Sequence, residues 1–290
     1  MSRIRTVPHA SWTQAPIEGA GSLTAVLEQG QVVFLPELAF VVGSQDANLF
    51  SPAILSSSKN ASFEPQSGRV GGTTLAGPEL ERLRGVMARF SDGARALVDA
   101  LCPAYRGRFE RGRASFRPAE IAGRQTSWRK DDTRLHVDSF PASPVQGRRI
   151  LRVFSNVNPE GKSRVWRVGG EFEAVAGRFA EKLSVPLPGT ASLLRLLRVT
   201  KTHRTPYDAL MLQLHDRMKE DAAFQQGSEQ EVFEFPSGST WMTFTDEVSH
   251  AARSGQYQLE QTFLLPIEAM ENEGRSPLRI LEKLKRRPLL

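Results

Sequence analysis

Two side chains that commonly bind metals are separated by one residue in the segment Leu135-His136-Val137-Asp138. On an extended strand, residues i and i+2 point to the same side, so His136 and Asp138 would face one ion. A second imidazole from a distant strand would complete a 2-His-1-carboxylate triad. That triad is typical of non-haem Fe(II) enzymes and leaves coordination positions open for other ligands.

The second imidazole must come from one of the other histidines, of which the chain has five in all. His9 lies close to the N-terminus and His203 in a polar linker. His215 is predicted on a helix beside Asp216, and adjacent helical residues diverge by about 100°, so these two cannot chelate one ion. His250 lies between two predicted strands far downstream. We therefore expect His250 as the third ligand, the alternative being a turn histidine without a metal.

The elements that would position this triad are mostly strands. Short β-type runs occur at residues 31–43, 133–138, 149–157, 164–168, 230–235, 239–245 and 256–265. Helical spacing predicts helices at 77–101, 171–183 and 206–220, the first with a possible break at Asp92-Gly93, and residues 56–76 resemble a loop. Strands on both sides of a helical insert, without alternating βα units, favour an all-β core with flanking helices. We predict a double-stranded β-helix, the cupin-like jelly roll.

The chain is expected to form one domain over residues 1–290. Its jelly-roll core would span about 105–266, with the N-terminal strands and helices of residues 1–104 packed on it. Residues 276–290 form a basic tail whose leucines fall on one side of a helix. Two interpretations stay open for the tail: a helix lying on an anionic membrane, or a helix docked on its own domain.

Composition narrows the class of protein. A hydrophobic content of 40% with 24% charged residues predicts an ordinary globular core. One cysteine, Cys102, excludes an internal disulfide and fits a reducing compartment. No apolar signal-like stretch begins the chain, and the longest apolar run, 32–42, is too short to cross a bilayer. We expect a cytoplasmic protein, and its net charge of +6 favours acidic partners.

Three stretches, residues 127–144, 147–173 and 241–266, together resemble the Kdo 3-hydroxylase family of Gram-negative bacteria (Kdo, 3-deoxy-D-manno-oct-2-ulosonic acid). The resemblance implies a jelly-roll dioxygenase that uses Fe(II), 2-oxoglutarate and O2, with ascorbate as reductant. It implies hydroxylation of carbon 3 of Kdo on a lipid A precursor, giving Ko, at the cytoplasmic face of the inner membrane. His136, Asp138 and His250 fall on the family's metal-ligand pattern.

The partners implied by the resemblance are a Kdo-bearing lipid A precursor and an anionic inner-membrane surface. Kdo carries a carboxylate and lipid A carries phosphates, so a basic chain with a basic tail suits both. We expect no nucleic-acid partner, because the sequence contains no recognised nucleic-acid motif.

The 2-oxoglutarate site departs from the pattern of the wider superfamily. Many members have an Arg about ten residues after the last metal-binding His, but position 260 here is Glu260, and Arg253 comes too early. A core-facing Arg should not be buried without an anion, so we predict Arg152 on the strand 149–157 as the carboxylate clamp. The alternative is that Arg152 faces solvent. Further candidates for binding 2-oxoglutarate are Arg149, Asn156 and Gln261.

Substrate binding is predicted at the mouth of the pocket. Cations suit the acidic groups of the substrate, and an aromatic face suits a sugar ring. The candidates are Trp128, Arg129, Lys130, Arg134, Trp166 and Arg167. The alternative is a solvated charged surface with the tryptophans in the core.

Two other functions stay open at this stage. One is a 2-oxoglutarate oxygenase acting on a different substrate. The other is a non-catalytic jelly-roll module that binds acidic sugars or nucleic acid through its arginines. Decarboxylation of 2-oxoglutarate in the presence of Fe(II) separates the enzymes from the binding module.

Overall fold

The computed structural model describes residues 2–15, 22–187 and 189–290. Two sheets form its centre: an eight-stranded mixed sheet in the order β1-β2-β9-β6-β11-β5-β3-β4, and a three-stranded antiparallel sheet in the order β10-β7-β8. The strands are β1 (Ile4–Thr6), β2 (Val32–Leu35), β3 (Ala61–Glu64), β4 (Arg69–Gly71), β5 (Glu110–Arg117), β6 (Arg149–Asn156), β7 (Arg164–Gly169), β8 (Gln230–Phe235), β9 (Thr240–Phe244), β10 (His250–Ser254) and β11 (Gln258–Leu265).

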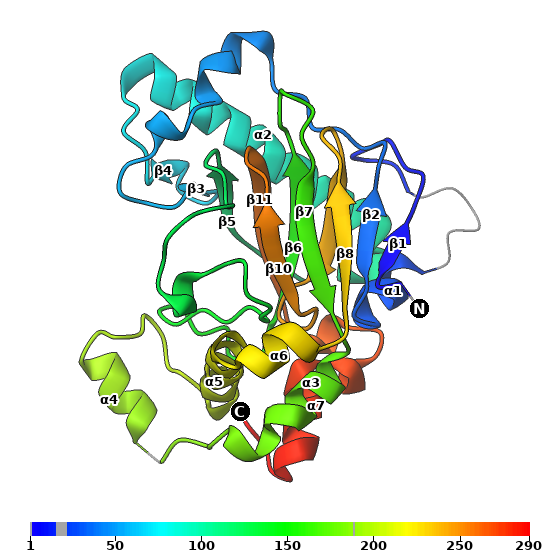
Figure 1. The fold of residues 1–290 in the computed structure, drawn as a ribbon, viewed down its shortest axis with the longest axis vertical. Coiled ribbons are helices and arrows are strands. Elements are labelled where there is room, and N and C mark those ends of the chain that lie inside the picture. Colours follow the sequence, from blue (N-terminus) through cyan, green and yellow to red (C-terminus); the bar gives the residue numbers. More distant parts are fainter. Residues whose placement is uncertain (1, 16–21, 188) are drawn as a thin grey trace.

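Helices cover one face and one end of these sheets (Figure 1). They are α1 (Leu23–Glu28), α2 (Gly77–Leu101), α3 (Phe172–Phe179), α4 (Thr190–Leu196), α5 (Pro206–Glu220), α6 (Ala222–Gly227) and α7 (Pro277–Lys285). The long helix α2 lies behind the large sheet, whereas α3, α5, α6 and α7 gather at one end of the strands, and α4 projects from the body. None of the described helices combines the length and the hydrophobicity that a bilayer crossing requires.

Strand alternation divides the core into two layers. In β6, Leu151 and Val153 face the hydrophobic layer that includes α2, while Phe154 faces the small sheet. Between the sheets, the Trp241 ring stacks on Phe235 with centroids 4.0 Å apart and on Phe154 at 5.4 Å. The sheets therefore enclose an aromatic layer. The all-β core with flanking helices that the sequence predicts is confirmed.

Several local predictions need correction. Residues 133–138 are not a strand, and their ladder contact is the single bridge from His136 to His250. The segment 56–76, expected as a loop, contains β3 and β4. The N-terminal strands β1 to β4 extend the large sheet of the core, because β2 pairs with β9 and β3 pairs with β5.

The helix α2 is continuous through Asp92-Gly93, where the sequence suggested a possible break. Glycine has a packing role at this position, since a Cβ on Gly93 would lie only 3.3 Å from the Trp12 ring. The indole of Trp12 packs edge-on against Phe90, one helical turn away, so the N-terminal segment packs against this helix.

The basic tail docks on its own domain. Leu278, Leu281 and Leu289 are buried in the main hydrophobic core. On the other side of α7, Lys283 pairs with Glu173 of α3 at 2.9 Å, and the Lys285 ammonium donates to the carbonyls of Ala180 and Leu183. The apolar side of the tail is therefore covered, which favours the docked interpretation over a helix on the membrane.

Arg149, at the start of β6, anchors the turn between β9 and β10. Its guanidinium pairs with Asp246 at 2.8 Å and with Glu247 at 2.5 Å, and all three side chains are buried. Burial raises the pKa of Glu247 to about 7, although Arg149 opposes this effect. The same turn leads directly into His250, so the cluster fixes the position of one predicted metal ligand.

We expect Glu247 to make the stability of the fold depend on pH. From pH 4.5 to about 7, the unfolded chain loses the proton that folded Glu247 retains. The free energy of unfolding should therefore fall as pH rises through this window, by up to about 3 kcal/mol, and level off above it. Urea unfolding of the Glu247→Gln variant should show a smaller fall. The exposed control Glu173→Gln should keep the wild-type profile, and identical profiles for all three proteins would contradict the assignment.

Candidate active site

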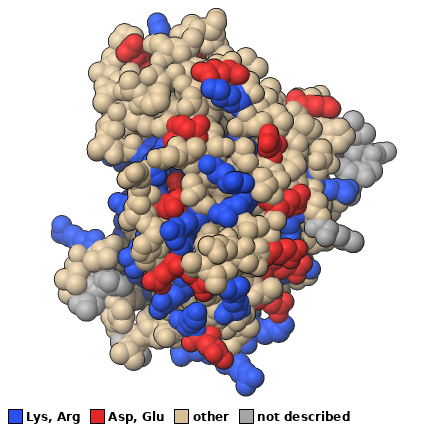
Figure 2. Space-filling view, viewed as in Figure 1, with Lys and Arg blue, Asp and Glu red and all other residues tan. Residues whose placement is uncertain are grey.

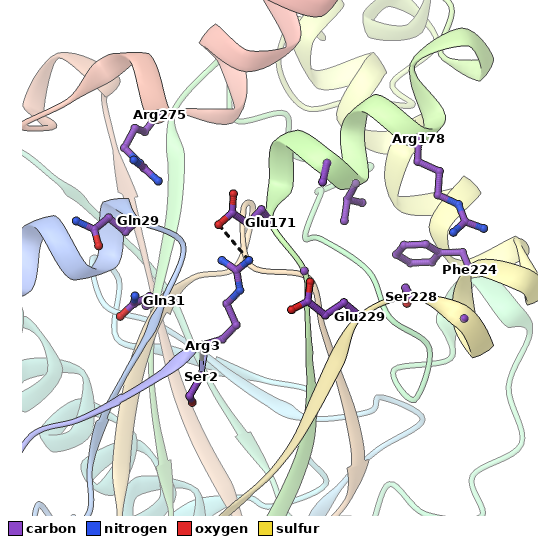
Figure 3. A pocket seen from close by; sticks show the side chains of 14 residues that line it. Ser2, Arg3, Gln29, Gln31, Glu171, Arg178, Phe224, Ser228, Glu229 and Arg275 are labelled. Carbon is purple, nitrogen blue, oxygen red and sulfur yellow. Dashed lines mark ion pairs between the residues drawn. The ribbon is translucent and has the colours of Figure 1, made fainter.

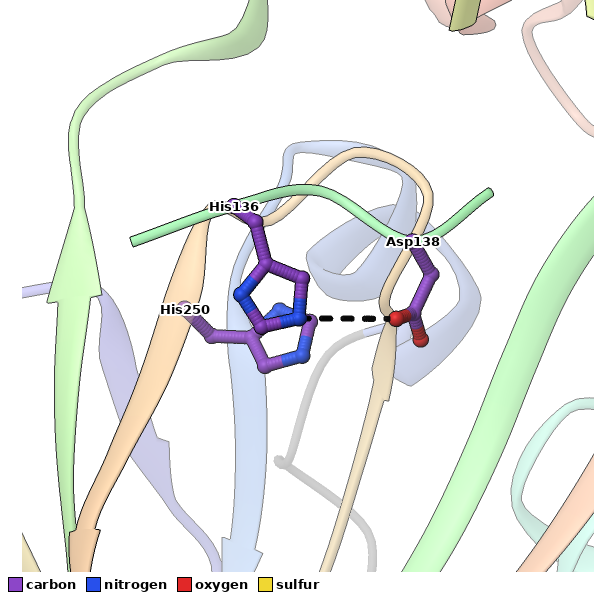
Figure 4. A group of neighbouring side chains, drawn as sticks. All are labelled: His136, Asp138 and His250. Atoms are coloured by element: carbon purple, nitrogen blue, oxygen red, sulfur yellow. Dashed lines mark ion pairs between the residues drawn. The ribbon is translucent and has the colours of Figure 1, made fainter. Parts of the chain in front are cut away.

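His136, Asp138 and His250 meet in the interior, as Figure 4 shows. One nitrogen or oxygen atom of each residue lies within 4.8 Å of the others, and His136 Nε2 is 3.8 Å from Asp138 Oδ1. His136 and Asp138 lie on the irregular segment before β6, whereas His250 is the first residue of β10. The structure thus brings together the three side chains that the sequence predicts as metal ligands.

Backbone hydrogen bonds hold the irregular segment in place. The His136 amide donates to the His250 carbonyl at 3.0 Å, and the His250 amide donates back to His136 at 2.8 Å. Two residues on, the Asp138 amide donates to Thr245 at 2.7 Å. These bonds attach the segment to both sides of the β9–β10 turn, so His136 and Asp138 face one point without belonging to a regular strand.

Each imidazole presents Nε2 to that point. Nδ1 of His136 lies 2.7 Å from the Arg134 carbonyl, and Nδ1 of His250 lies 2.8 Å from the Val248 carbonyl, so each Nδ1 carries the proton. Burial lowers the pKa of both imidazoles below the usual range, with the neighbouring His250 adding to the effect at His136. Both rings are therefore neutral and can donate lone pairs to a metal.

Asp138 supplies a negative charge to the same point. Burial would raise the pKa of its carboxyl, but the Arg152 guanidinium lowers it below the ordinary value. Its Oδ2 atom is buried without a hydrogen-bond partner. A carboxylate and two neutral imidazoles with inward lone pairs are a ligand set that fits Fe(II), and these three residues would hold the ion.

The small cavity beside the triad, about 70 Å³, is lined by three arginines and three carboxylates, in addition to the histidines and apolar groups. Glu260 receives two hydrogen bonds from Arg117, at 2.9 and 3.1 Å. Arg152 lies 3.3 Å from Asp138 and 3.6 Å from Glu260. The acidic side chains of the cavity are therefore paired, as buried charges must be.

Arg164, the first residue of β7, has no carboxylate partner among the described residues. One of its Nη atoms donates to the Gly255 carbonyl at 2.7 Å, and its Nε is buried without a partner. Burial, together with repulsion from Arg117, lowers the pKa of Arg164 to about 9. A buried guanidinium without a counter-ion is costly and indicates the binding site of an anion.

The sequence interpretation missed Arg164, although a signal for it was present. Arg164 and Trp166 are separated by one residue in β7, so both side chains face the same side of the strand. The same alternation applies in β11, where Gln258 and Glu260 line the cavity. Gln258 Oε1 is buried there without a partner, which makes it an additional polar contact for a ligand.

Of the four residues predicted to bind 2-oxoglutarate, the structure brings only Arg152 to the cavity. Arg149 is held by Asp246 and Glu247 in the buried cluster described above. The Asn156 amide donates to the carbonyls of Lys162 and Phe235. Gln261 alternates with the cavity-facing Glu260 and donates to the carbonyls of Gly112 and Thr262. The last three side chains have structural partners elsewhere.

The residues predicted at the pocket mouth separate into two groups. Trp166 lies inside, stacked on His250 with ring centroids 5.1 Å apart. Its neighbour Arg167 faces the other side of β7 and donates to Thr133 and Gln230. Arg134 donates to the Lys219 carbonyl at 2.8 Å and pairs with Asp131. These contacts hold the walls of the site.

Trp128, Arg129 and Lys130 form a short 3-10 turn beside α5. The Arg129 guanidinium lies over the Trp128 ring and pairs with Asp216 at 3.2 Å. Asp216 also bonds His215, whose ring lies 5.3 Å from that of His136. His215 therefore contacts the triad from outside, a proximity that the sequence did not reveal.

A larger cleft of about 830 Å³ lies elsewhere, between β1, the β7–α3 junction and α6 (Figure 3). Its lining shares no residue with the cavity beside the triad. Arg3 and Glu171 face each other across it at 3.3 Å. Size alone therefore does not locate the chemistry of this protein.

A jelly-roll core that buries a His-x-Asp…His triad beside an unpaired arginine defines the class of Fe(II)/2-oxoglutarate-dependent dioxygenases. The sequence model of the 3-deoxy-D-manno-oct-2-ulosonic acid (Kdo) hydroxylase family matches residues 11–288. The chain belongs to this family, and the class and family that the sequence predicts are confirmed. No curated protein matches the chain significantly.

Crystal structures of the Kdo hydroxylase KdoO, a non-haem Fe(II) α-ketoglutarate-dependent dioxygenase, are similar to this chain throughout. The cobalt(II) complex has 41% sequence identity and a TM-score of 0.95, over 99% of this chain and 97% of that one. The complexes with Fe(III) and either α-ketoglutarate or succinate have the same identity and coverage and TM-scores of 0.94. Iron and 2-oxoglutarate, the predicted cofactors, are thus the groups that KdoO binds.

We expect the His136→Ala variant to lose Fe(II) affinity by about a hundredfold or more, because one of three protein ligands disappears. Anaerobic equilibrium dialysis measures this affinity, and circular dichroism shows whether the variant folds. The control His215→Ala removes an imidazole that contacts His136 but lies outside the triad. It should bind iron normally. Equal iron affinity of both variants would refute the ligand assignment.

Proposed function

We propose that this member of the Kdo hydroxylase family hydroxylates carbon 3 of a Kdo residue on a lipid A precursor, giving Ko, at an anionic membrane surface. The observation that carries the proposal is the buried triad with the unpaired Arg164 beside it. In the balanced reaction, a C–H bond, O2 and 2-oxoglutarate give C–OH, succinate and CO2. Fe(II) and 2-oxoglutarate, when bound, supply the activation of O2 needed to break an unactivated C–H bond.

Arg164 is the residue best suited to bind the distal carboxylate of 2-oxoglutarate. Arg117 and Arg152 already have carboxylate partners, whereas Arg164 has a backbone carbonyl alone. The charges of the cavity support this role. Asp132, the third carboxylate of the lining, pairs with Lys59 at 3.2 Å, so no carboxylate of the lining pairs with Arg164. The dianionic co-substrate would supply the missing negative charge.

Arg152 has a positioning role in this proposal. It lies between Asp138 and Glu260, at 3.3 and 3.6 Å, and its guanidinium is held near the Phe140 ring. The contact with Asp138 keeps this carboxylate ionised and oriented toward the two imidazoles. Glu260, which occupies the position of the usual clamp, holds Arg117 and Arg152 instead.

Apolar side chains keep bulk water away from the reacting atoms. Ile121, Phe154, Trp166 and Ala252 form the remaining walls of the cavity and are buried. Trp166 also fixes the orientation of His250 by stacking. A dry site strengthens the electrostatic contacts that bind the co-substrate and protects the reactive centre from side reactions.

An acidic, lipid-linked acceptor suits the surface of the molecule. Lys and Arg side chains gather over the middle and lower part of the face in Figure 2, where Figure 1 places α3, α5, α6 and α7. Arg129 and Lys130 are exposed beside Asp216 and His215, close to the triad. We propose these two cations, with the neighbouring Trp128, as contacts for the Kdo carboxylate or the lipid phosphates.

The direct test of the proposed function is product mass. Purified protein would be incubated with Fe(II), ascorbate and a Kdo-bearing lipid A precursor dispersed in detergent, with and without 2-oxoglutarate. We expect a gain of about 16 Da that requires 2-oxoglutarate, because one oxygen atom is inserted. Succinate without a mass gain would discard the acceptor but keep the oxygenase, and the absence of both products would reject the enzyme.

A second prediction concerns Arg164. The Arg164→Gln variant should raise the KM for 2-oxoglutarate by about thirtyfold or more, because removing one partner of a buried charge pair costs at least 2 kcal/mol. The control Arg253→Gln removes an exposed arginine of β10 that does not line the cavity and should leave this KM unchanged. If Arg152→Gln raises the KM while Arg164→Gln does not, the carboxylate site belongs to Arg152.

A further inference from the structure

The segment of residues 183–205, which contains α4, extends from the body of the protein (Figure 1). We call it the α4 segment. Large apolar side chains are exposed along it: Leu187 is 80% exposed, Leu196 78%, Leu197 63% and Val199 51%. Elsewhere in the described chain, large exposed apolar residues are scattered singly, as at Val41 and Val232. A cluster of this kind marks an interaction surface rather than ordinary surface composition.

The charge of the α4 segment is entirely positive. Residues 183–205 contain four Lys or Arg residues and no Asp or Glu. Arg195 and Arg198 are exposed and flank the exposed leucines at positions 196 and 197. Exposed apolar side chains next to unopposed cations are the combination that binds an anionic lipid surface.

The α4 segment is tied to the rim of the iron cavity. The Lys201 amide donates to the Ala142 carbonyl at 2.9 Å, and the Arg204 guanidinium donates to Pro141 at 2.6 Å. The preceding residue, Phe140, lies against Arg152 of the cavity. A surface bound by the α4 segment would therefore lie beside the segment that carries Asp138.

A cleft of about 620 Å³ separates the α4 segment from α5. Leu187 and Leu212 contribute apolar lining, and Arg204 and Arg287 contribute positive charge. Its lining also includes Asp216, the partner of His215 next to the triad. The cleft thus connects the exposed apolar patch with the surroundings of the iron site.

We propose that the α4 segment is the surface by which this protein docks on an anionic lipid bilayer, with Leu187, Leu196, Leu197 and Val199 inserted between headgroups. Arg195, Arg198 and Lys201 would contact the lipid phosphates. The proposal rests on the proposed function in one respect: docking here would present the rim of the cavity to a lipid-linked acceptor. The basic tail is less suited to this role, because Leu278, Leu281 and Leu289 are buried in the core.

Vesicle flotation tests the surface directly. The full chain is mixed with vesicles of phosphatidylcholine, with or without one quarter phosphatidylglycerol. We expect binding to the anionic vesicles, and a fall of about tenfold or more in the partition coefficient for the Leu196→Ser/Leu197→Ser double variant. The matched control Val41→Ser/Val232→Ser removes two exposed apolar side chains elsewhere and should bind like the wild type.

The charge of the surface is tested separately. The Arg195→Glu/Arg198→Glu variant should bind anionic vesicles more weakly, and added salt should weaken wild-type binding in the same direction. Insertion is tested with an environment-sensitive fluorophore on the Leu197→Cys variant, since the single native thiol, Cys102, is fully buried. Its emission should shift to the blue on anionic vesicles, while the same label on Val41→Cys should not respond.

Three results would overturn the proposal. The wild-type chain could fail to bind anionic vesicles, or the serine variant could bind them as well as the control does. The third result is that the serine substitutions turn a dimer into a monomer without affecting lipid binding. The last result would assign the patch to a second copy of the chain. None of these measurements requires turnover. If the chain hydroxylates the detergent-dispersed acceptor but does not bind vesicles, the proposed function stands and the docking surface is refuted. If the chain binds vesicles through the α4 segment but does not hydroxylate the acceptor, the docking surface stands and the proposed function is refuted.

Discussion

The reciprocal pair of backbone hydrogen bonds between His136 and His250 is the constraint on which the site depends. These residues lie far apart in the sequence, and one of them belongs to no regular strand. The bonds place the two Nε2 atoms near each other, while the Asp138 amide is held by Thr245 on the other side of the same turn. Arg149 holds the β9–β10 turn through its ion pairs with Asp246 and Glu247. A buried ion-pair cluster outside the triad therefore helps to position the metal ligands.

Charge balance is the second constraint on the interior. Three arginines and three carboxylates share a cavity that could not hold any one of these charges alone. Because Glu260 occupies the position where related oxygenases often have their clamping cation, the cations come from β5, β6 and β7 instead. Glu260 and Asp138 then neutralise Arg117 and Arg152, which leaves Arg164 as the unpaired cation of the lining. The cations that face the cavity therefore lie on three other strands and not at the position of Glu260.

The sequence predicts the triad and the type of core correctly because both follow from local patterns: a His-x-Asp pair, and strands with alternating side chains. It is harder to predict from the sequence which face of a strand lines the cavity, because shifting the register by one residue exchanges the two faces. Gln261 was predicted at the cavity, but Gln258 and Glu260 line it, and Arg164 was missed for the same reason. The contact of His215 with His136 depends on the packing of α5 against the site, which no local pattern reveals.

Amphipathic helices illustrate the same limit. The sequence of α7 shows a basic side and an apolar side, a pattern equally compatible with a membrane surface and with the protein's own core. Packing decides between them, since Leu278 and Leu281 are buried against the core that also contains residues of α3. In the α4 segment, hydrophobic residues of the same type remain exposed because no element of the described chain covers them. Hydrophobicity thus shows that a surface must be covered, and only the arrangement of the fold shows whether the chain itself covers it.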